Sequence, residues 1–124
     1  MERLDILYLV NRRYYVEKMA RERFSSMDAI GKIANVTYWG IGWKGWVDNY
    51  SVYENIKRIS GGKRKKYDIV IAYKPLEMRN FKDIPYRKCL RYNEMWDTRW
   101  TLREIKESDC ELVICHHLND TRRY

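Results

Sequence analysis

Two carboxylates and two histidines stand where apolar runs of the sequence give way to polar side chains. Glu94 and Asp97 are three residues apart, so one can act as a general base that the other orients, or both can hold sugar hydroxyl groups. Asp97 has an alternative role as the N-cap of the following helix. His116 and His117 point to opposite sides of an extended segment, which argues against a shared metal ion. One of them can hydrogen-bond a substrate while the other packs beneath the sheet.

Further polar and aromatic side chains follow the other apolar runs. In an open parallel sheet, ligands bind beyond the carboxyl ends of the strands, so residues at these ends are the predicted site. The predicted catalytic residues are Glu94, Asp97 and His116, and the predicted substrate-binding residues are Asn11, Arg12, Trp43, Lys74, Asn93 and His117.

Hydrophobic periodicity predicts the elements that would bring these side chains together. Short, nearly continuous apolar runs are typical of strands buried on both faces of a parallel sheet. Five such runs cover residues 5–10, 36–39, 68–73, 88–92 and 111–115. Apolar positions three and four apart predict a long helix over 16–34, and capping boxes at Ser51–Glu54 and Thr101–Glu104 predict two further helix starts, the second helix running to about Ser108.

The alternation of strands and helices predicts an α/β fold. We expect a Rossmann-like open, mostly parallel five-stranded sheet with helices on both faces, in a single domain over residues 1–124. The first predicted loop, after residues 5–10, has no GxGxxG, and GxxxxGK[ST] does not occur in the chain, which excludes the usual dinucleotide-binding and P-loop enzymes, and no cofactor is expected. Three cysteines without a CxxC pair are expected as buried thiols.

Charge and hydropathy restrict the partners and the location. A formal net charge of +8 suits nucleic acid, an anionic membrane surface or a phosphorylated substrate, and its sign alone does not choose among them. The basic run 63–66 is expected to be a solvated loop, although such runs also bind phosphates or acidic lipid head groups. Arg23 lies within an apolar stripe, so it needs an anionic partner from the domain or a substrate. With no signal-peptide pattern and no run near the ~20 apolar residues of a membrane span, we expect a cytoplasmic protein, free or peripheral to a membrane.

Four segments together resemble the N-terminal domain of GT-B glycosyltransferases of the family 4-like group, and this similarity extends over nearly the whole chain. They are Lys18–Phe24, Asp68–Pro75, Arg91–Asp97 and Leu112–His117. The resemblance implies an acceptor-side domain that binds a sugar or glycan, with the nucleotide-sugar donor held by a C-terminal domain that this chain lacks. It also implies that Asn93, Glu94 and Asp97 face the cleft between the two domains. The chain departs from the family in its first loop, where Asn11-Arg12-Arg13 replaces a glycine-rich segment.

Three hypotheses follow from these observations. The first is the N-terminal, acceptor-side half of a two-domain glycosyltransferase, inactive without its donor half. The second is a basic nucleic-acid-binding module that uses residues 63–66 and exposed aromatic rings. The third is a scaffold that kept the fold without the chemistry, because fold and function are separable.

Overall fold

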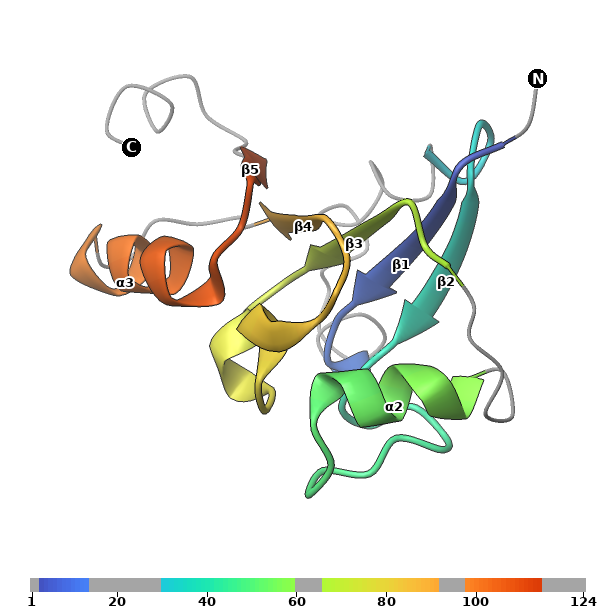
Figure 1. Ribbon diagram of the computed structural model, residues 1–124, viewed down its shortest axis with the longest axis horizontal. Helices are drawn as coiled ribbons and strands as arrows, with labels where there is room; N and C mark the ends of the chain where they lie inside the picture. The colour runs from blue at the N-terminus through green and yellow to red at the C-terminus, as the bar shows by residue number, and fades with distance from the viewer. Residues whose placement is uncertain (1–2, 14–29, 60–65, 92–97, 115–124) are drawn as a thin grey trace.

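The computed structural model describes residues 3–13, 30–59, 66–91 and 98–114 of the chain (Figure 1). Five strands form one sheet in the order β2-β1-β3-β4-β5, and every neighbouring pair is parallel. They are β1 (Asp5–Leu9), β2 (Asn35–Trp39), β3 (Ile69–Ala72), β4 (Lys88–Arg91) and β5 (Leu112–Ile114). The predicted α/β class and open parallel sheet are therefore confirmed, and each strand bound lies within two residues of its prediction.

The two central strands are apolar on both faces, which is why they pair with each other in the middle of the sheet. In β1 and β3, Leu7 pairs with Val70 and Leu9 with Ala72, and all four side chains are fully buried on one face. The residues between them, Tyr8 among them, are buried on the other face. A strand with both faces buried has to lie inside the sheet, with a packed layer on each face. A strand at an exposed edge would lack apolar contacts on both faces.

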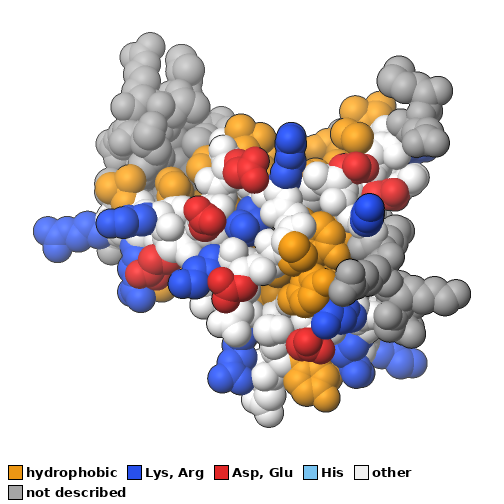
Figure 2. All heavy atoms as spheres, in the orientation of Figure 1, with side chains coloured by type: hydrophobic (Ala, Val, Ile, Leu, Met, Phe, Trp, Pro, Cys, Tyr) orange, Lys and Arg blue, Asp and Glu red, His pale blue; other side chains and the backbone are white. Residues whose placement is uncertain are grey.

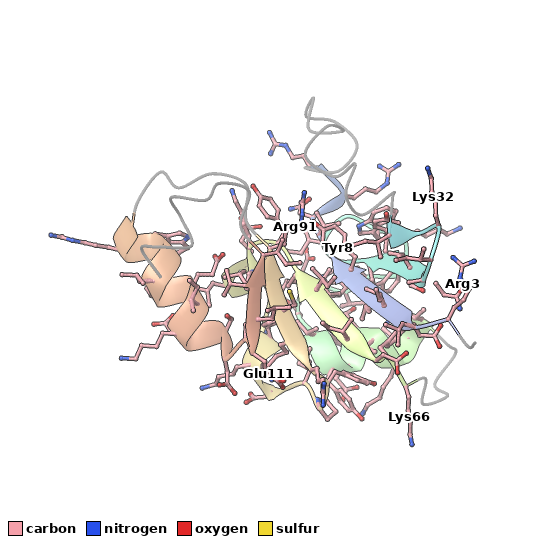
Figure 3. All side chains as sticks on the ribbon, turned by 90° about the horizontal axis from the view of Figure 1, so that it is seen from above. Arg3, Tyr8, Lys32, Lys66, Arg91 and Glu111 are labelled. Carbon is pink, nitrogen blue, oxygen red and sulfur yellow. The ribbon has the colours of Figure 1, made fainter. Side chains whose placement is uncertain are left out.

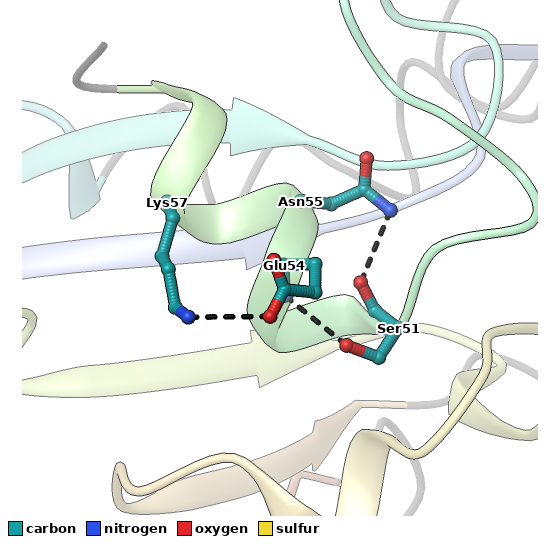
Figure 4. Close-up of polar contacts among 4 residues, drawn as sticks. All are labelled: Ser51, Glu54, Asn55 and Lys57. Carbon is teal, nitrogen blue, oxygen red and sulfur yellow. Dashed lines mark hydrogen bonds and ion pairs between the residues drawn. The ribbon is translucent and has the colours of Figure 1, made fainter. Parts of the chain in front are cut away.

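One face of the sheet is covered by α2 (Val52–Ile59), as Figure 1 shows. Val52 and Ile56 enter the same hydrophobic cluster as the β1 and β3 side chains. The predicted capping at Ser51 is present, since its Oγ accepts the Glu54 N–H at 3.2 Å (Figure 4). Further along α2, Lys57 Nζ lies 3.2 Å from Glu54 Oε1, a solvent-exposed pair that adds little to stability.

The opposite face carries a second hydrophobic cluster. It contains Tyr8, Ile71 and Cys89, with Ala34 packed against them. Burial raises the pKa of the Cys89 thiol to about 12, so the prediction of a buried thiol is confirmed for this residue. The helix predicted over 16–34 falls mostly on residues outside the described segments, as do Arg23, most of the basic run 63–66 and the third cysteine.

The connection after β3 forms two short 3₁₀ helices, η2 (Pro75–Glu77) and η3 (Phe81–Asp83), and α3 (Thr98–Ser108) lies against both. The predicted helix start at Thr101 is wrong, because α3 begins at Thr98. The Thr101–Glu104 pair is therefore inside the helix and cannot be a capping box, and the Glu104 side chain is buried. Within the described segments, neither α-helix has both the length and the apolar character needed to cross a bilayer.

A substitution at Gly40 tests how closely the loop after β2 packs against Val10. A Cβ atom at this position would lie 2.5 Å from the Val10 carbonyl oxygen, and its φ of +140° is a conformation that other residues rarely adopt. We expect Gly40→Ala to lower the free energy of unfolding by roughly 2 kcal/mol or more, measured by urea denaturation. Gly42→Ala is the matched control. A Cβ atom there would lie 3.2 Å from its nearest atom, Arg12 Cβ, so this variant should lose less free energy of unfolding. Equal losses for both variants would contradict this seating.

Candidate functional site

The carboxyl ends of β1 and β3 lie side by side at the centre of the candidate site. Leu9 pairs with Ala72, and the Tyr73 N–H donates to the Leu9 carbonyl at 3.0 Å, so the pairing continues one residue beyond β3. In the order β2-β1-β3, the chain first crosses to one side of β1 and later to the other. Doubly wound sheets bind ligands at such a switch point, because the loops on its two sides diverge and leave a crevice. Asn11 and Lys74 follow these two strands and border this position.

The loop after β2 is tied to the loop after β1 by backbone hydrogen bonds. The Val10 N–H donates to Trp39 O at 3.0 Å, and the Arg12 N–H donates to Ile41 O at 2.9 Å. These bonds bring the two chains so close that glycine is needed at position 40, where any side chain would meet the Val10 carbonyl. The first two loops therefore form one connected wall of the site.

Aromatic rings hold the side chains of this wall in place. The indole N–H of Trp43 donates to the Val10 carbonyl at 2.9 Å, and the Trp43 ring stacks on Tyr38 with centroids 6.1 Å apart. The Arg12 guanidinium lies over the Trp43 ring, 5.9 Å from its centroid. Asn11 Oδ1 accepts the Arg13 N–H at 2.9 Å, which fixes the turn that carries Arg12.

Lys74 forms the other wall, and its backbone is unusual. It adopts the left-handed conformation, with φ of 53° and ψ of 58°, immediately before Pro75. A non-glycine residue in this region costs about 1 kcal/mol, so the surrounding structure has to impose it. Its ammonium group lies 5.6 Å from the centroid of the Tyr73 ring. Lys74 is thus held at the point where the chain turns from β3 into η2.

Glu104 of α3 is a buried carboxyl group next to Lys74. Only 5% of the residue is exposed, and its Oε2 has no hydrogen-bond partner among the described residues. Burial raises the pKa of Glu104 to about 7, the Lys74 cation and a hydrogen bond from Trp100 lower it in part, and Glu77 raises it. Near neutral pH, this carboxyl group is therefore only partly ionised.

Arg91 and Tyr8 form a second buried polar pair, with Tyr8 on the face of the sheet opposite α2 (Figure 3). Arg91, the last residue of β4, is 1% exposed, and its Nη1 donates to the Tyr8 hydroxyl at 3.3 Å. Tyr8 in turn meets Tyr38 edge to face, with centroids 5.8 Å apart. Because Tyr38 stacks on Trp43, contacts run without a break from Arg91 to the aromatic wall of the site.

A hollow lies beside this edge, next to the turn that follows Lys74. A cavity of about 1050 Å³ separates the 3₁₀ helices from α3 and is bordered by Pro75, the residue after Lys74. Its other lining residues include Phe81, Leu102, Arg103 and Lys106. It is an open groove of mixed polarity, so it does not identify a ligand by itself.

The structure brings together four of the predicted site residues. Asn11, Arg12 and Trp43 come from the loops after β1 and β2, and Lys74 follows β3, all at the same edge of the sheet. The other predicted residues fall outside the described segments: Asn93, Glu94, Asp97, His116 and His117. Their positions in the sequence, after β4 and β5, keep their assignment to this edge a prediction.

Sequence reasoning missed the functional potential of two residues. Arg91 ends a strand whose other residues are buried, and an arginine at a buried position needs a polar partner, so a signal was present. Glu104 carried a misleading signal, because its spacing from Thr101 imitates a capping box. Only the packing of α3 against the turn after β3 shows that Glu104 is a buried residue and not part of a capping box.

Comparisons with known proteins do not identify the site. No protein-family model matches the sequence, and no curated protein or solved structure matches it significantly. In the segments that the structure describes, no three His, Cys, Asp or Glu residues gather in a way that could hold a metal ion. The chemistry of the site has to be inferred from its own residues.

The buried carboxyl group predicts a pH dependence of stability. Because the folded-state pKa of Glu104 is about 7, above the ordinary 4.5, the folded chain holds a proton that the unfolded chain releases between these values. Stability should therefore fall as pH rises from about 4.5 to 7 and then level off. We expect Glu104→Gln to remove this fall and to raise the free energy of unfolding at pH 8 by about 2 kcal/mol, measured by urea denaturation.

Glu107 is the matched control on the same helix. It is exposed and pairs with Arg103 at 3.1 Å, so Glu107→Gln should change stability by less than about 0.5 kcal/mol at both pH 5 and pH 8. If Glu104→Gln and Glu107→Gln behave alike at the two pH values, Glu104 is not buried beside Lys74 as described.

Proposed function

We propose that this chain is the acceptor-side domain of a GT-B glycosyltransferase, and that a sugar or glycan binds at the β1/β3 edge. The observation that carries the proposal is the assembly of Asn11, Arg12, Trp43 and Lys74 around the switch point of a parallel sheet. The resemblance of four sequence segments to that family supports the same assignment. Fold alone would not, because this architecture hosts many activities.

The side chains at this edge have the chemistry that a saccharide requires. A sugar ring has an apolar face that stacks on an aromatic ring and hydroxyl groups that need donors and acceptors. Trp43 is half-buried and is fixed through its indole N–H, with Tyr38 stacked on its ring and Arg12 over it, so the part of the ring that stays exposed is held rigidly. Asn11 offers both donor and acceptor groups, while Arg12 and Lys74 offer donors.

The catalytic part of the proposal rests on the residues after β4 and β5. The carboxyl ends of these strands lie at the same edge as those of β1 and β3, since all pairs are parallel. We assign general-base chemistry to Glu94, oriented by Asp97, and a substrate hydrogen bond to His116 or His117, with Asn93 beside them. The nucleotide-sugar donor would be held by a second domain, and the enzyme would act in the cytoplasm, free or at the surface of a membrane.

Nucleic-acid binding is the less supported alternative. On the face shown in Figure 2, described Lys and Arg side chains lie interspersed with Asp and Glu side chains. Proteins that bind a nucleic-acid backbone gather their cations in a continuous stripe or patch, because the phosphates follow one another at short intervals. This face carries no such patch among its described residues.

Saccharide binding to the chain tests the acceptor role. We expect amide NMR signals of residues 10–13, 40–46 and 73–75, together with the Trp43 indole N–H signal, to shift during titration with neutral mono- and disaccharides. Trp43→Ala should weaken binding at least about tenfold, since stacking on a single ring contributes 1–3 kcal/mol or so in comparable recognition. Trp43→Phe keeps a flat ring and should retain part of the affinity.

Tyr50→Ala is the control for this test, because Tyr50 is an exposed aromatic residue whose described ring contact is with Arg58. It should leave saccharide affinity unchanged. Shifts spread over the whole chain, or none for any saccharide, would count against the acceptor role.

Turnover tests the catalytic assignment in the complete enzyme, with both domains present. Glu94→Ala should lower kcat by at least about a hundredfold with little change in KM, because a general base acts in the transition state. Release of the nucleoside diphosphate in the presence of acceptor measures this. Undiminished kcat would remove Glu94 from the chemistry while leaving the acceptor site intact.

A further inference from the structure

Asn55 is a polar residue on the buried side of α2. It is fully buried, and Val52 and Ile56 on the same side of the helix are buried in the hydrophobic cluster beneath α2. An apolar side chain would pack at such a position without any hydrogen bond, whereas a buried amide group is costly unless its donors and its acceptor are bonded. The hydrogen bonds of Asn55 therefore indicate why a polar residue occupies this position.

The amide group of Asn55 bonds the backbone of residues 40–51, the segment between β2 and α2, which we call the β2–α2 loop. Its Oδ1 accepts the Val47 N–H at 2.8 Å, and its Nδ2 donates to the Val47 carbonyl at 2.9 Å. Nδ2 also donates to the carbonyl oxygens of Ser51 at 3.2 Å (Figure 4) and Tyr50 at 3.4 Å. Both backbone groups of Val47 are thus bonded by one side chain, as an antiparallel strand would bond them.

Other contacts join the same part of the loop to α2 and to the end of β2. The indole N–H of Trp39 donates to the backbone carbonyl of Asn55 at 2.9 Å, and the Trp46 ring meets the Trp39 ring edge to face, with centroids 6.0 Å apart. Arg58 Nε donates to the Gly45 carbonyl at 2.9 Å. The second half of the β2–α2 loop is therefore attached to α2, with the bonds from Asn55 at its centre.

Trp43 lies between this half of the loop and the half that is attached to the loop after β1. Its backbone N–H donates to the Gly40 carbonyl at 3.1 Å, and its own carbonyl accepts the Trp46 N–H at 3.0 Å. Two successive turns therefore run from residue 40, which packs on Val10, to residue 46, which precedes Val47. Release of Val47 would leave the backbone of Trp43 attached on one side only.

We propose that Asn55 is a positioning residue of the candidate site. By bonding Val47, it holds the β2–α2 loop against α2, so that Trp43 keeps its place at the edge of the sheet before a ligand binds. A loop fixed in advance loses less conformational entropy on binding, so these bonds contribute to affinity without any contact with the ligand. In calling this ligand a saccharide, the inference rests on the proposed function.

Hydrogen exchange in the chain without ligand tests the positioning role directly. Asn55→Leu has a side chain of similar size that removes the amide bonds and leaves the backbone contact with Trp39 in place. We expect the Val47 amide and the Trp43 indole N–H to exchange at least about tenfold faster than in the unchanged chain, because local opening becomes easier. The amides of Leu7 and Val70, inside the sheet, should keep their rates. Asn55→Ala, which adds no bulk, should behave in the same way.

A double-mutant cycle tests whether Asn55 acts through Trp43. Asn55→Leu alone should weaken saccharide binding about tenfold, measured by NMR titration. In a Trp43→Ala background, the same change should cost less than about twofold more, because two residues that act through one contact are not additive. Losses that add in the double variant would show that Asn55 does not act through Trp43 and would overturn the inference.

Glu54→Gln is the matched control on the same helix. Glu54 is exposed and its carboxylate pairs with Lys57, so this change should alter neither the exchange rates nor the affinity. If Glu54→Gln speeds the exchange of Val47 as much as Asn55→Leu does, the effect is a general loosening of α2 and the inference is wrong.

The two proposals fail in different ways. If saccharides bind the unchanged chain and Asn55→Leu equally well, the positioning role is wrong and the acceptor role survives. If no saccharide binds the unchanged chain, the acceptor role is wrong and hydrogen exchange alone decides on Asn55. In that case, faster exchange at Val47 and Trp43 supports the positioning role, and unchanged rates overturn it.

Discussion

The parallel pairing of β1 with β3 is the constraint on which the candidate site depends. Leu7, Leu9, Val70 and Ala72 bury one face of this pair, and Tyr8 and Ile71 bury the other. A shift of one residue in register would exchange the faces of every side chain in a strand, so the two hydrophobic clusters fix the pairing firmly. Because the register is fixed, the points at which Arg12 and Lys74 leave the sheet are fixed as well.

Much of this framework follows from the sequence, and the rest depends on tertiary contacts. Continuous apolar runs identify the strands, since they match strands buried on both faces, and Ser51 marks the start of α2 through a local hydrogen bond. The strand order is different, because nothing in a single run shows on which side of β1 the next strand will lie. The predicted start of α3 is wrong because it, too, depends on tertiary contacts. Glu104 makes its deciding contact with Lys74, 30 positions away in the sequence.

The backbone of Lys74 shows that the fold gives up some stability to hold this residue in place. Its left-handed backbone costs about 1 kcal/mol that a glycine there would avoid, yet a glycine would provide no ammonium group. Asn80, at the other left-handed position of the same connection, is a residue type that tolerates this conformation well. The strained residue of this connection is therefore Lys74, which borders the site. Strained backbone conformations are commonly found in functional sites.

Arg91 and Glu104 are both buried, and they respond to burial in opposite ways. A guanidinium keeps its charge in a folded protein, so burial makes Arg91 depend on hydrogen-bond acceptors such as the Tyr8 hydroxyl. A carboxyl group can escape the cost of burial by keeping its proton, and the raised pKa of Glu104 shows that it does so over much of the range below pH 7. Burial therefore lowers the negative charge of Glu104 near neutral pH, whereas a buried guanidinium keeps its positive charge.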